Sequence, residues 1–148
     1  MSKLILMSGI PGAGKTTYAH NIPNAKVISN DDIRFSLTHG VFLEQKEWNV
    51  LPVEPIQEKL IIEASRKYKT VILDCTAITN QKRLYYYNKY KEYFNKFELI
   101  FLNTALEKCL YQNSKRTKRV PDWKIIEMNS QLETISEEVQ KVFKIKIL

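Results

Sequence analysis

The amino-acid sequence predicts an α/β fold, with a five-stranded, mostly parallel β-sheet covered by helices on both faces. Two observations lead to this prediction. Short apolar runs alternate along the chain with segments of helical periodicity, and this alternation is typical of parallel sheets covered by helices. The 148 residues contain no repeat, low-complexity tract or linker, so residues 1–148 are expected to form a single domain.

The expected strands are short apolar runs, and the expected helices carry apolar residues every three or four positions. The strands are expected at residues 3–7, 26–29, 71–74, 97–102 and 143–147, the last at a sheet edge because its apolar residues alternate with lysines. The helices are expected at about 15–21, 55–68, 80–94 and 105–112, and from residue 122 onwards. Residues 37–52 have no clean period and are expected to form a loop with one helical turn. This loop is either an acceptor-binding flap or an ordinary surface connection.

The helix expected at residues 80–94 mixes tyrosine with lysine, as surfaces that stack on nucleic-acid bases also do. Tyr86, Tyr90, Tyr93 and Phe97 nevertheless come close to helical spacing. The spacing favours a stripe that faces the core over a base-stacking surface.

A glycine-rich loop follows the first expected strand and opens onto a helix. Its residues, Gly9-Ile10-Pro11-Gly12-Ala13-Gly14-Lys15-Thr16-Thr17, match the phosphate-binding pattern G-x-x-x-x-G-K-[ST] in the required order of strand, loop and helix. A side chain at Gly12 or Gly14 would hold phosphate oxygens away from the backbone amides. Lys15 can reach the β- and γ-phosphates, and the Thr16 hydroxyl can ligate Mg²⁺. The residues expected to contact the nucleotide in this loop are Gly12, Ala13, Gly14, Lys15, Thr16 and Thr17.

Acidic residues follow the second and third expected strands. In an open parallel sheet, ligands sit beyond the carboxyl ends of the strands, so Asp31 and Asp32 are expected on the same rim as the phosphate loop. One of these aspartates can also cap the helix that follows. Arg34 lies one turn further on, near enough to meet an anionic substrate group. Asp74 ends an apolar strand in the manner of a Walker-B acid, which reaches Mg²⁺ through water or orients a catalytic group.

The most basic stretch of the chain, Lys115-Arg116-Thr117-Lys118-Arg119, lies between two expected helices. A flexible basic segment at about residues 113–120 suits a lid that closes over transferring phosphates. Arginine in such a lid neutralises the charge spread over the γ-phosphoryl oxygens. A solvated basic turn is the alternative interpretation.

The formal net charge of +7 favours polyanionic partners, nucleic acid above all, although lysine-rich surfaces also serve solubility. Cys75 and Cys109 are far apart and lack metal-ligand neighbours. This usage fits a reduced, cytoplasmic setting, which would be the host cytosol for a phage-encoded protein. The sequence has neither an apolar segment long enough to span a bilayer nor an N-terminal secretory pattern, so no membrane association is expected.

Three strings resemble, in the same order, the kinase module of the bacteriophage polynucleotide 5′-kinase family and the P-loop kinases related to it. They are Gly9–Thr17, Asn30-Asp31-Asp32-Ile33-Arg34, and Asn113-Ser114-Lys115-Arg116 before Val120-Pro121. The likeness covers most of the chain and is weak only between about residues 38 and 55. It implies a P-loop NTPase-type fold with a short basic lid, and ATP- and Mg²⁺-dependent phosphorylation of the 5′-hydroxyl end of DNA or RNA.

The resemblance also implies roles for individual residues. Asp31 matches the family's general base on the acceptor hydroxyl, which leaves Asp32 as a cap or support. Arg34 matches the arginine that contacts the acceptor phosphate next to the attacked nucleoside. Arg116 matches the lid arginine that contacts the nucleotide phosphates. Lys15, Asp31 and Arg116 are therefore the expected catalytic residues, with Thr16 as the metal ligand.

The chain departs from this family at several positions. Gln112 stands where many members have a second lid arginine, so that Lys118 or Arg119 would take over its duty. After the third strand many relatives read Asp-x-Thr-Asn, whereas this chain reads Asp74-Cys75-Thr76-Ala77, and the phage family's own acid falls at Cys75. The role of Asp74 is therefore open. The Asp-x-Asp-Gly-Thr signature of the family's phosphatase half does not occur, so kinase activity alone is expected.

Two other classes of function fit parts of the sequence. A small-molecule kinase acting on a nucleoside, sugar or antibiotic would use the same base, lid and loop, and only its acceptor pocket would differ. A nucleotide-binding regulatory module without an acceptor would leave Asp31 and Arg116 without a role. A protein that only binds nucleic acid would not need the phosphate loop.

Overall fold

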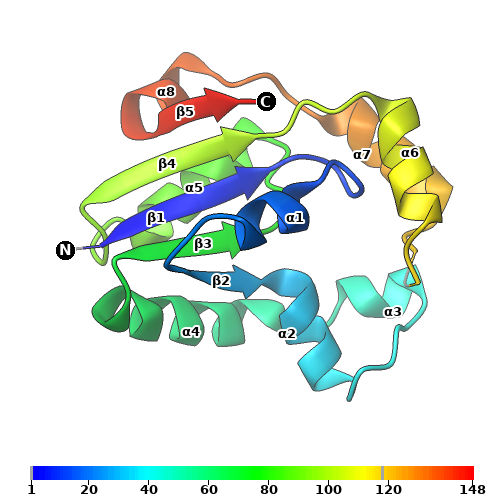
Figure 1. The fold of residues 1–148 in the computed structure, drawn as a ribbon, viewed down its shortest axis with the longest axis horizontal. Coiled ribbons are helices and arrows are strands. Elements are labelled where there is room, and N and C mark those ends of the chain that lie inside the picture. The colour runs from blue at the N-terminus through cyan, green and yellow to red at the C-terminus, as the bar shows by residue number, and fades with distance from the viewer. Residues whose placement is uncertain (1, 118) are drawn as a thin grey trace.

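A parallel β-sheet runs through the middle of the protein in the computed structural model, which describes residues 2–117 and 119–148 (Figure 1). Across these residues five strands lie in the order β2-β3-β1-β4-β5, and every neighbouring pair is parallel. The strands are β1 (Lys3–Ser8), β2 (Ala25–Ser29), β3 (Thr70–Asp74), β4 (Lys96–Phe101) and β5 (Lys144–Ile147). The predicted sheet is confirmed, including the edge position of β5, and it is entirely rather than mostly parallel.

Helices cover both faces of the sheet, as predicted. They are α1 (Lys15–His20), α2 (Asn30–Leu37), α3 (Gln45–Asn49), α4 (Val53–Lys67), α5 (Asn80–Tyr90), α6 (Leu106–Ser114), α7 (Asp122–Gln131) and α8 (Glu137–Val142). Alternate residues of β1 pack into the cores on opposite faces of the sheet, because successive side chains of a strand point to opposite faces. Leu4 and Leu6 belong to the core under α2, α4, α5 and α8, whereas Ile5 and Met7 belong to the core under α1, α6 and α7. Within the described parts of the chain, none of the helices is long and apolar enough to cross a membrane.

Two helix predictions need correction at their boundaries, and one helix was not predicted. α5 ends at Tyr90 rather than residue 94, although Tyr86 and Tyr90 are buried and the preference for core packing is confirmed. α6 continues to Ser114, so the first two residues assigned to the lid are helical. α8 was not predicted, and its first turn is capped by Ser136, whose hydroxyl accepts the backbone N–H of Val139 at 3.2 Å.

The segment between α2 and α4 contains the expected single helical turn, which is α3. The expectation that an aspartate caps the preceding helix is wrong. The cap of α2 is Ser29, whose hydroxyl accepts the backbone N–H of Asp32 at 3.3 Å. Both aspartates lie in the first helical turn. Their negative charges stabilise α2 there, because the N-terminus is the positive end of the helix dipole.

A buried arginine joins three segments behind the phosphate loop. Arg83 of α5 is 0% exposed and donates to the Ser8 hydroxyl at 3.2 Å, to the Ala77 carbonyl at 3.0 Å and to the Glu133 carbonyl at 2.9 Å. Burial lowers the pKa of the Arg83 guanidinium to about 10, so the group stays charged at neutral pH. These bonds hold the end of β1, the loop after β3 and the connection before α8 together.

The strand register brings the chemically important segments to one edge. Ser29 at the end of β2 pairs with Asp74 at the end of β3, and β1 next to β3 ends at Ser8, directly before the glycine loop. Residues that follow these strand ends therefore meet at the carboxyl edge of the sheet, as the sequence predicts.

Candidate active site

A cavity of about 520 Å³ opens at the carboxyl edge of the sheet. Nearly all of the residues that the sequence nominates line it: Gly12, Gly14, Lys15, Thr16, Thr17, Asp31, Arg34, Asp74 and Arg116. Ala13 is the exception. It is only 6% exposed, and its carbonyl accepts a hydrogen bond from the Thr104 hydroxyl at 2.9 Å.

Two glycines of the loop have backbone φ angles in the left-handed region, +84° at Gly12 and +100° at Gly14. A Cβ atom at Gly12 would also run into the backbone carbonyl of Cys109 in α6. Gly12 is therefore required for close packing of the loop against α6, a reason beyond the phosphate contact that the sequence suggests.

Lys15 begins α1 and is 8% exposed. Its ammonium donates to the Ile10 carbonyl at 3.0 Å, within the loop itself. Burial lowers the pKa of this ammonium from its ordinary value, and the charge of Asp74 opposes the shift. The arrangement holds a desolvated cation where phosphate oxygens would lie against the loop.

Thr16 and Asp74 form a direct contact across the sheet edge. The Thr16 hydroxyl donates to Asp74 Oδ2 at 2.7 Å. Burial raises the pKa of the Asp74 carboxyl, while the Thr16 hydrogen bond and the charge of Lys15 act in the other direction. A hydroxyl and a buried carboxylate are oxygen ligands of the kind Mg²⁺ takes, so these two residues fit a divalent cation next to bound phosphates.

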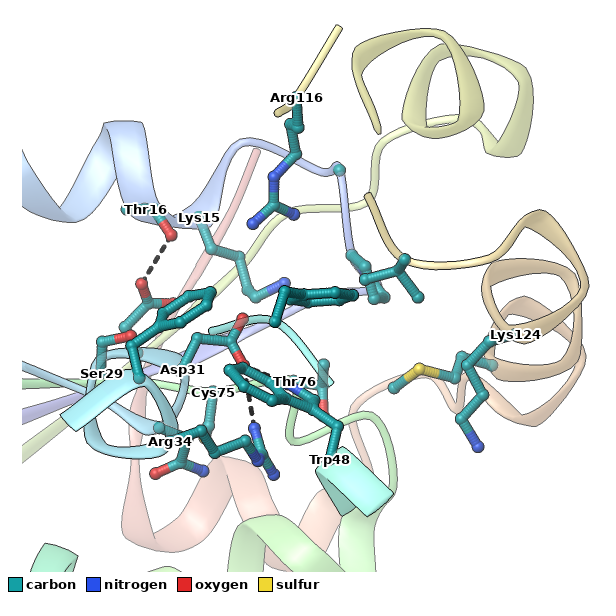
Figure 2. Close-up of a pocket in the computed structure, with 18 of the residues that line it drawn as sticks. Lys15, Thr16, Ser29, Asp31, Arg34, Trp48, Cys75, Thr76, Arg116 and Lys124 are labelled. Atoms are coloured by element: carbon teal, nitrogen blue, oxygen red, sulfur yellow. Dashed lines mark hydrogen bonds and ion pairs between the residues drawn. The ribbon is translucent and has the colours of Figure 1, made fainter. Parts of the chain in front are cut away.

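Asp31 lies on the opposite wall of the cavity from Arg116, and its carboxylate has two donors (Figure 2). Arg34 Nη1 lies 2.9 Å from Asp31 Oδ1, and the indole Nε1 of Trp48 lies 3.4 Å from the same oxygen. Arg34 Nε is buried and has no hydrogen-bond partner among the described residues. Asp31 is about half exposed, which leaves its carboxylate open to the cavity.

Of the described residues in the basic segment after α6, Arg116 lines the cavity. Arg116 points towards Lys15 in Figure 2, and Gln112 and Val120 also line the cavity. Arg119, one candidate to replace the second lid arginine, is exposed and is not part of the lining. The other candidate, Lys118, lies outside the described residues.

The family model AAA_33, described as an AAA domain, matches residues 4–135. The chain belongs to the AAA_33 family.

The chain is similar to individual proteins that include kinases with different acceptors. The L-seryl-tRNA(Sec) kinase of Methanococcus maripaludis is 28% identical over 134 residues, which are 88% of this chain and 52% of that protein. The structure of the Pnkp1/Rnl/Hen1 RNA repair complex contains a chain that matches 97% of this one with a TM-score of 0.74 and 20% identity, over 46% of its own length. A sugar kinase from Janibacter sp. HTCC2649 matches the whole of this chain with a TM-score of 0.67 and 18% identity, over 85% of its own length.

These likenesses show the family of the chain, but they do not identify its acceptor. The fold of this AAA_33 chain is that of the P-loop kinases, and its kinase relatives indicate a nucleotide-binding phosphotransferase. They do not single out the bacteriophage polynucleotide 5′-kinases within that group. The chain spans about half the length of the tRNA kinase and of the RNA-repair protein that it matches.

The cavity also has lining residues that the sequence analysis did not predict. One group comes from α2, α3 and the turn between them and contains Phe35, Phe42 and Trp48, and a second group comes from α7 and contains Lys124 and Met128. The only sequence signal for the first group was the position of residues 37–52 as a possible acceptor flap. The second group had no signal, because α7 reads as an ordinary amphipathic helix.

Cys75 lines the floor of the cavity at the position where the phage family has its acid. Burial raises the pKa of its thiol to about 12, so the side chain stays neutral at physiological pH. Asp74, directly before it, is the carboxylate that contacts Thr16.

Proposed function

We propose that this chain transfers the γ-phosphoryl group of ATP to the 5′-hydroxyl end of DNA or RNA. The observation that carries the proposal is that Asp31 and the phosphate loop line the same cavity. A carboxylate in one cavity with a phosphate loop suits a reaction in which a hydroxyl attacks a bound phosphate in line.

In this reaction Asp31 accepts the proton of the acceptor hydroxyl as its oxygen forms a bond to the γ-phosphorus. The bond between the γ-phosphorus and the β,γ-bridging oxygen breaks, and ADP leaves. Lys15, Arg116 and the amides of the loop hold the negative charge that spreads over the transferring group. Mg²⁺, held by Thr16 and by Asp74 directly or through water, would neutralise the β- and γ-phosphates.

Arg34 is the proposed contact for the acceptor. Its Nη1 already binds Asp31, while its Nε lacks a partner among the described residues. The guanidinium is therefore suited to bridge the general base and an anionic group of the substrate, such as the phosphate next to the attacked nucleoside.

A nucleic-acid acceptor is favoured by the net charge of +7 and by the likeness to two proteins, a tRNA kinase and a component of an RNA repair complex. A small-molecule acceptor is the second candidate. It is favoured by the sugar kinase, whose own chain is matched over a larger share of its length.

The test is transfer of label from γ-labelled ATP, with Mg²⁺, to three acceptors: a 5′-hydroxyl oligonucleotide, the same oligonucleotide with a 5′-phosphate, and a nucleoside 3′-phosphate. We expect label on the 5′-hydroxyl oligonucleotide and none on its 5′-phosphorylated form. Asp31→Asn should fold and bind ATP but lose about 10²–10⁴-fold in turnover, the usual value of general-base catalysis.

Two results would overturn the proposal. ATP binding without transfer to any of these acceptors would favour a small-molecule substrate. Normal turnover of Asp31→Asn would remove Asp31 as the base.

A further inference from the structure

Trp48 contacts the proposed general base from an element that the family resemblance does not cover. It lies in α3, within the stretch between about residues 38 and 55, and its indole Nε1 lies 3.4 Å from Asp31 Oδ1. Figure 2 shows Trp48 and Arg34 on the same side of Asp31, the side away from Arg116.

Both donors reach the same carboxylate oxygen. Arg34 Nη1 is 2.9 Å from Oδ1, and the indole N–H completes the pair. A carboxylate oxygen with two donors is fixed in position, and its rotation about the Cβ–Cγ bond is restricted. The other oxygen, Oδ2, is then the one left to accept the proton of a substrate hydroxyl.

The indole is held firmly although α3 is only one turn long. Trp48 is 4% exposed, and its ring packs against Phe35 and Phe42 with ring centroids 4.7 Å and 4.9 Å away. The Arg34 guanidinium also lies over the indole, 6.0 Å from its centroid. The aromatic cluster of Phe35, Phe42 and Trp48 therefore sets the direction of the N–H bond.

We propose that Trp48 is a positioning residue, whose indole N–H orients Asp31 so that Oδ2 faces the acceptor hydroxyl. The proposal rests on the function proposed above, because it requires Asp31 to be the base. It also gives the segment between α2 and α4 a defined task. Phe42 lines the cavity and packs on Trp48, so the segment that would meet the acceptor also orients the base.

The first experiment is the kinetics of Trp48→Phe, which keeps an aromatic ring and loses the N–H donor. We expect kcat to fall about 3- to 10-fold, in line with the loss of one hydrogen bond of typical strength, with little change in KM for ATP or acceptor. Trp48→His, which restores a ring N–H, should recover part of the loss. The matched control is Trp123→Phe, because Trp123 is the other tryptophan of the chain and is 58% exposed on α7.

The second experiment is a double-mutant cycle with Asp31→Asn. If Trp48 acts through Asp31, Trp48→Phe should cause no further loss of kcat in the Asp31→Asn background. An equal loss in both backgrounds, or an unchanged kcat for Trp48→Phe alone, would overturn the proposal. Normal turnover of Asp31→Asn would instead overturn the proposed function, so the two failures are distinct.

A spectroscopic measurement does not depend on activity. In the Trp123→Phe protein, Trp48 is the only tryptophan, and we expect its fluorescence emission to change when Asp31 is replaced by alanine. An identical spectrum would show that the indole and the carboxylate are not in contact, and the proposal would be wrong.

Discussion

Two buried charges of opposite sign lie at the phosphate loop, and neither is fully compensated there. Burial raises the pKa of Asp74 and lowers that of Lys15, so in each case the neutral form is favoured relative to an exposed group. Their mutual attraction reduces both shifts without cancelling them. Bound phosphates and a divalent cation would supply the missing partners, so the loop is less stable empty than occupied.

The first prediction concerns Asp74→Asn, which keeps a carbonyl oxygen for the Thr16 hydroxyl and removes the charge. Because the pKa of Asp74 is higher in the folded state than its ordinary value of 3.8, the charged form destabilises the folded state. We expect the variant without nucleotide to unfold a few degrees above the native protein at pH 7. We expect MgATP to raise the melting temperature of the native protein more than that of the variant, as thermal unfolding with and without MgATP will show.

The sign of the pH dependence provides the control. The cost of the Asp74 charge is present above its folded pKa and disappears as pH falls below about 3.8, where the carboxyl is protonated in both states. The stability difference between variant and native protein should therefore shrink in acid. Equal stabilisation of both proteins by MgATP would contradict a role for Asp74 at the metal.

At the scale of the elements, one asparagine closes the base of the lid. Asn113 at the end of α6 is 0% exposed, and its side chain donates to the Val120 carbonyl at 2.7 Å and accepts the Val120 N–H at 3.1 Å. The backbone N–H of Arg116 also donates to the Asn113 carbonyl, at 3.1 Å. Asn113 therefore holds the basic segment from both sides, through the Arg116 N–H near its start and through Val120 directly after its end.

The second prediction is that Asn113→Ala releases Val120 and loosens the basic segment. Two partly buried hydrogen bonds are lost, so the free energy of unfolding should fall by about 1–3 kcal/mol. Because Arg116 is then held less firmly over Lys15, we expect kcat to fall more than stability alone explains, and trypsin to cleave faster at Lys115 or Arg116. Ser114→Ala is the control, since Ser114 is exposed and its hydroxyl donates to the Tyr111 carbonyl of its own helix. Unchanged cleavage and kcat in Asn113→Ala would show that the hydrogen bonds between Asn113 and Val120 do not position the lid.

The element boundaries show which signals the sequence carries and which it lacks. Strand positions were predictable because buried parallel strands are continuous apolar runs. The end of α5 was misjudged because Phe94 is also buried, so the apolar pattern continues past the last helical turn. α8 was missed although Ser136, followed by Glu137 and Glu138, is a usable helix-start signal.

The candidate site divides in the same way. The phosphate loop is local, so its motif sufficed to predict that Lys15 and Thr16 line the cavity. The contact between Trp48 and Asp31 joins residues 17 apart across a segment without helical or strand period, and only the tertiary packing of the aromatic cluster creates it. Sequence patterns report periodicity and motifs, and neither applies to such a contact.

At the scale of the whole molecule, the net charge of +7 is the property that most clearly separates the two candidate acceptors. A polynucleotide presents several phosphates and releases several counterions on binding, whereas a nucleoside phosphate or a sugar presents one phosphate or none. Basic residues of the cavity rim, such as Lys124, can meet phosphates beyond the first. Under the proposed function, the charge would be part of acceptor binding rather than of solubility alone.

The third prediction follows from this difference and uses salt as the variable. The KM for a 5′-hydroxyl oligonucleotide should rise steeply with salt, with log KM increasing by about 0.7 for each phosphate contacted per unit of log salt concentration. The KM for a nucleoside 3′-phosphate should rise with a slope near that of one contact, and it serves as the control for effects on the catalytic centre. The steeper slope should become shallower in Lys124→Ala, while kcat at saturating acceptor stays the same. If both acceptors have the same slope, the protein contacts only one acceptor phosphate, and the positive surface serves solubility instead.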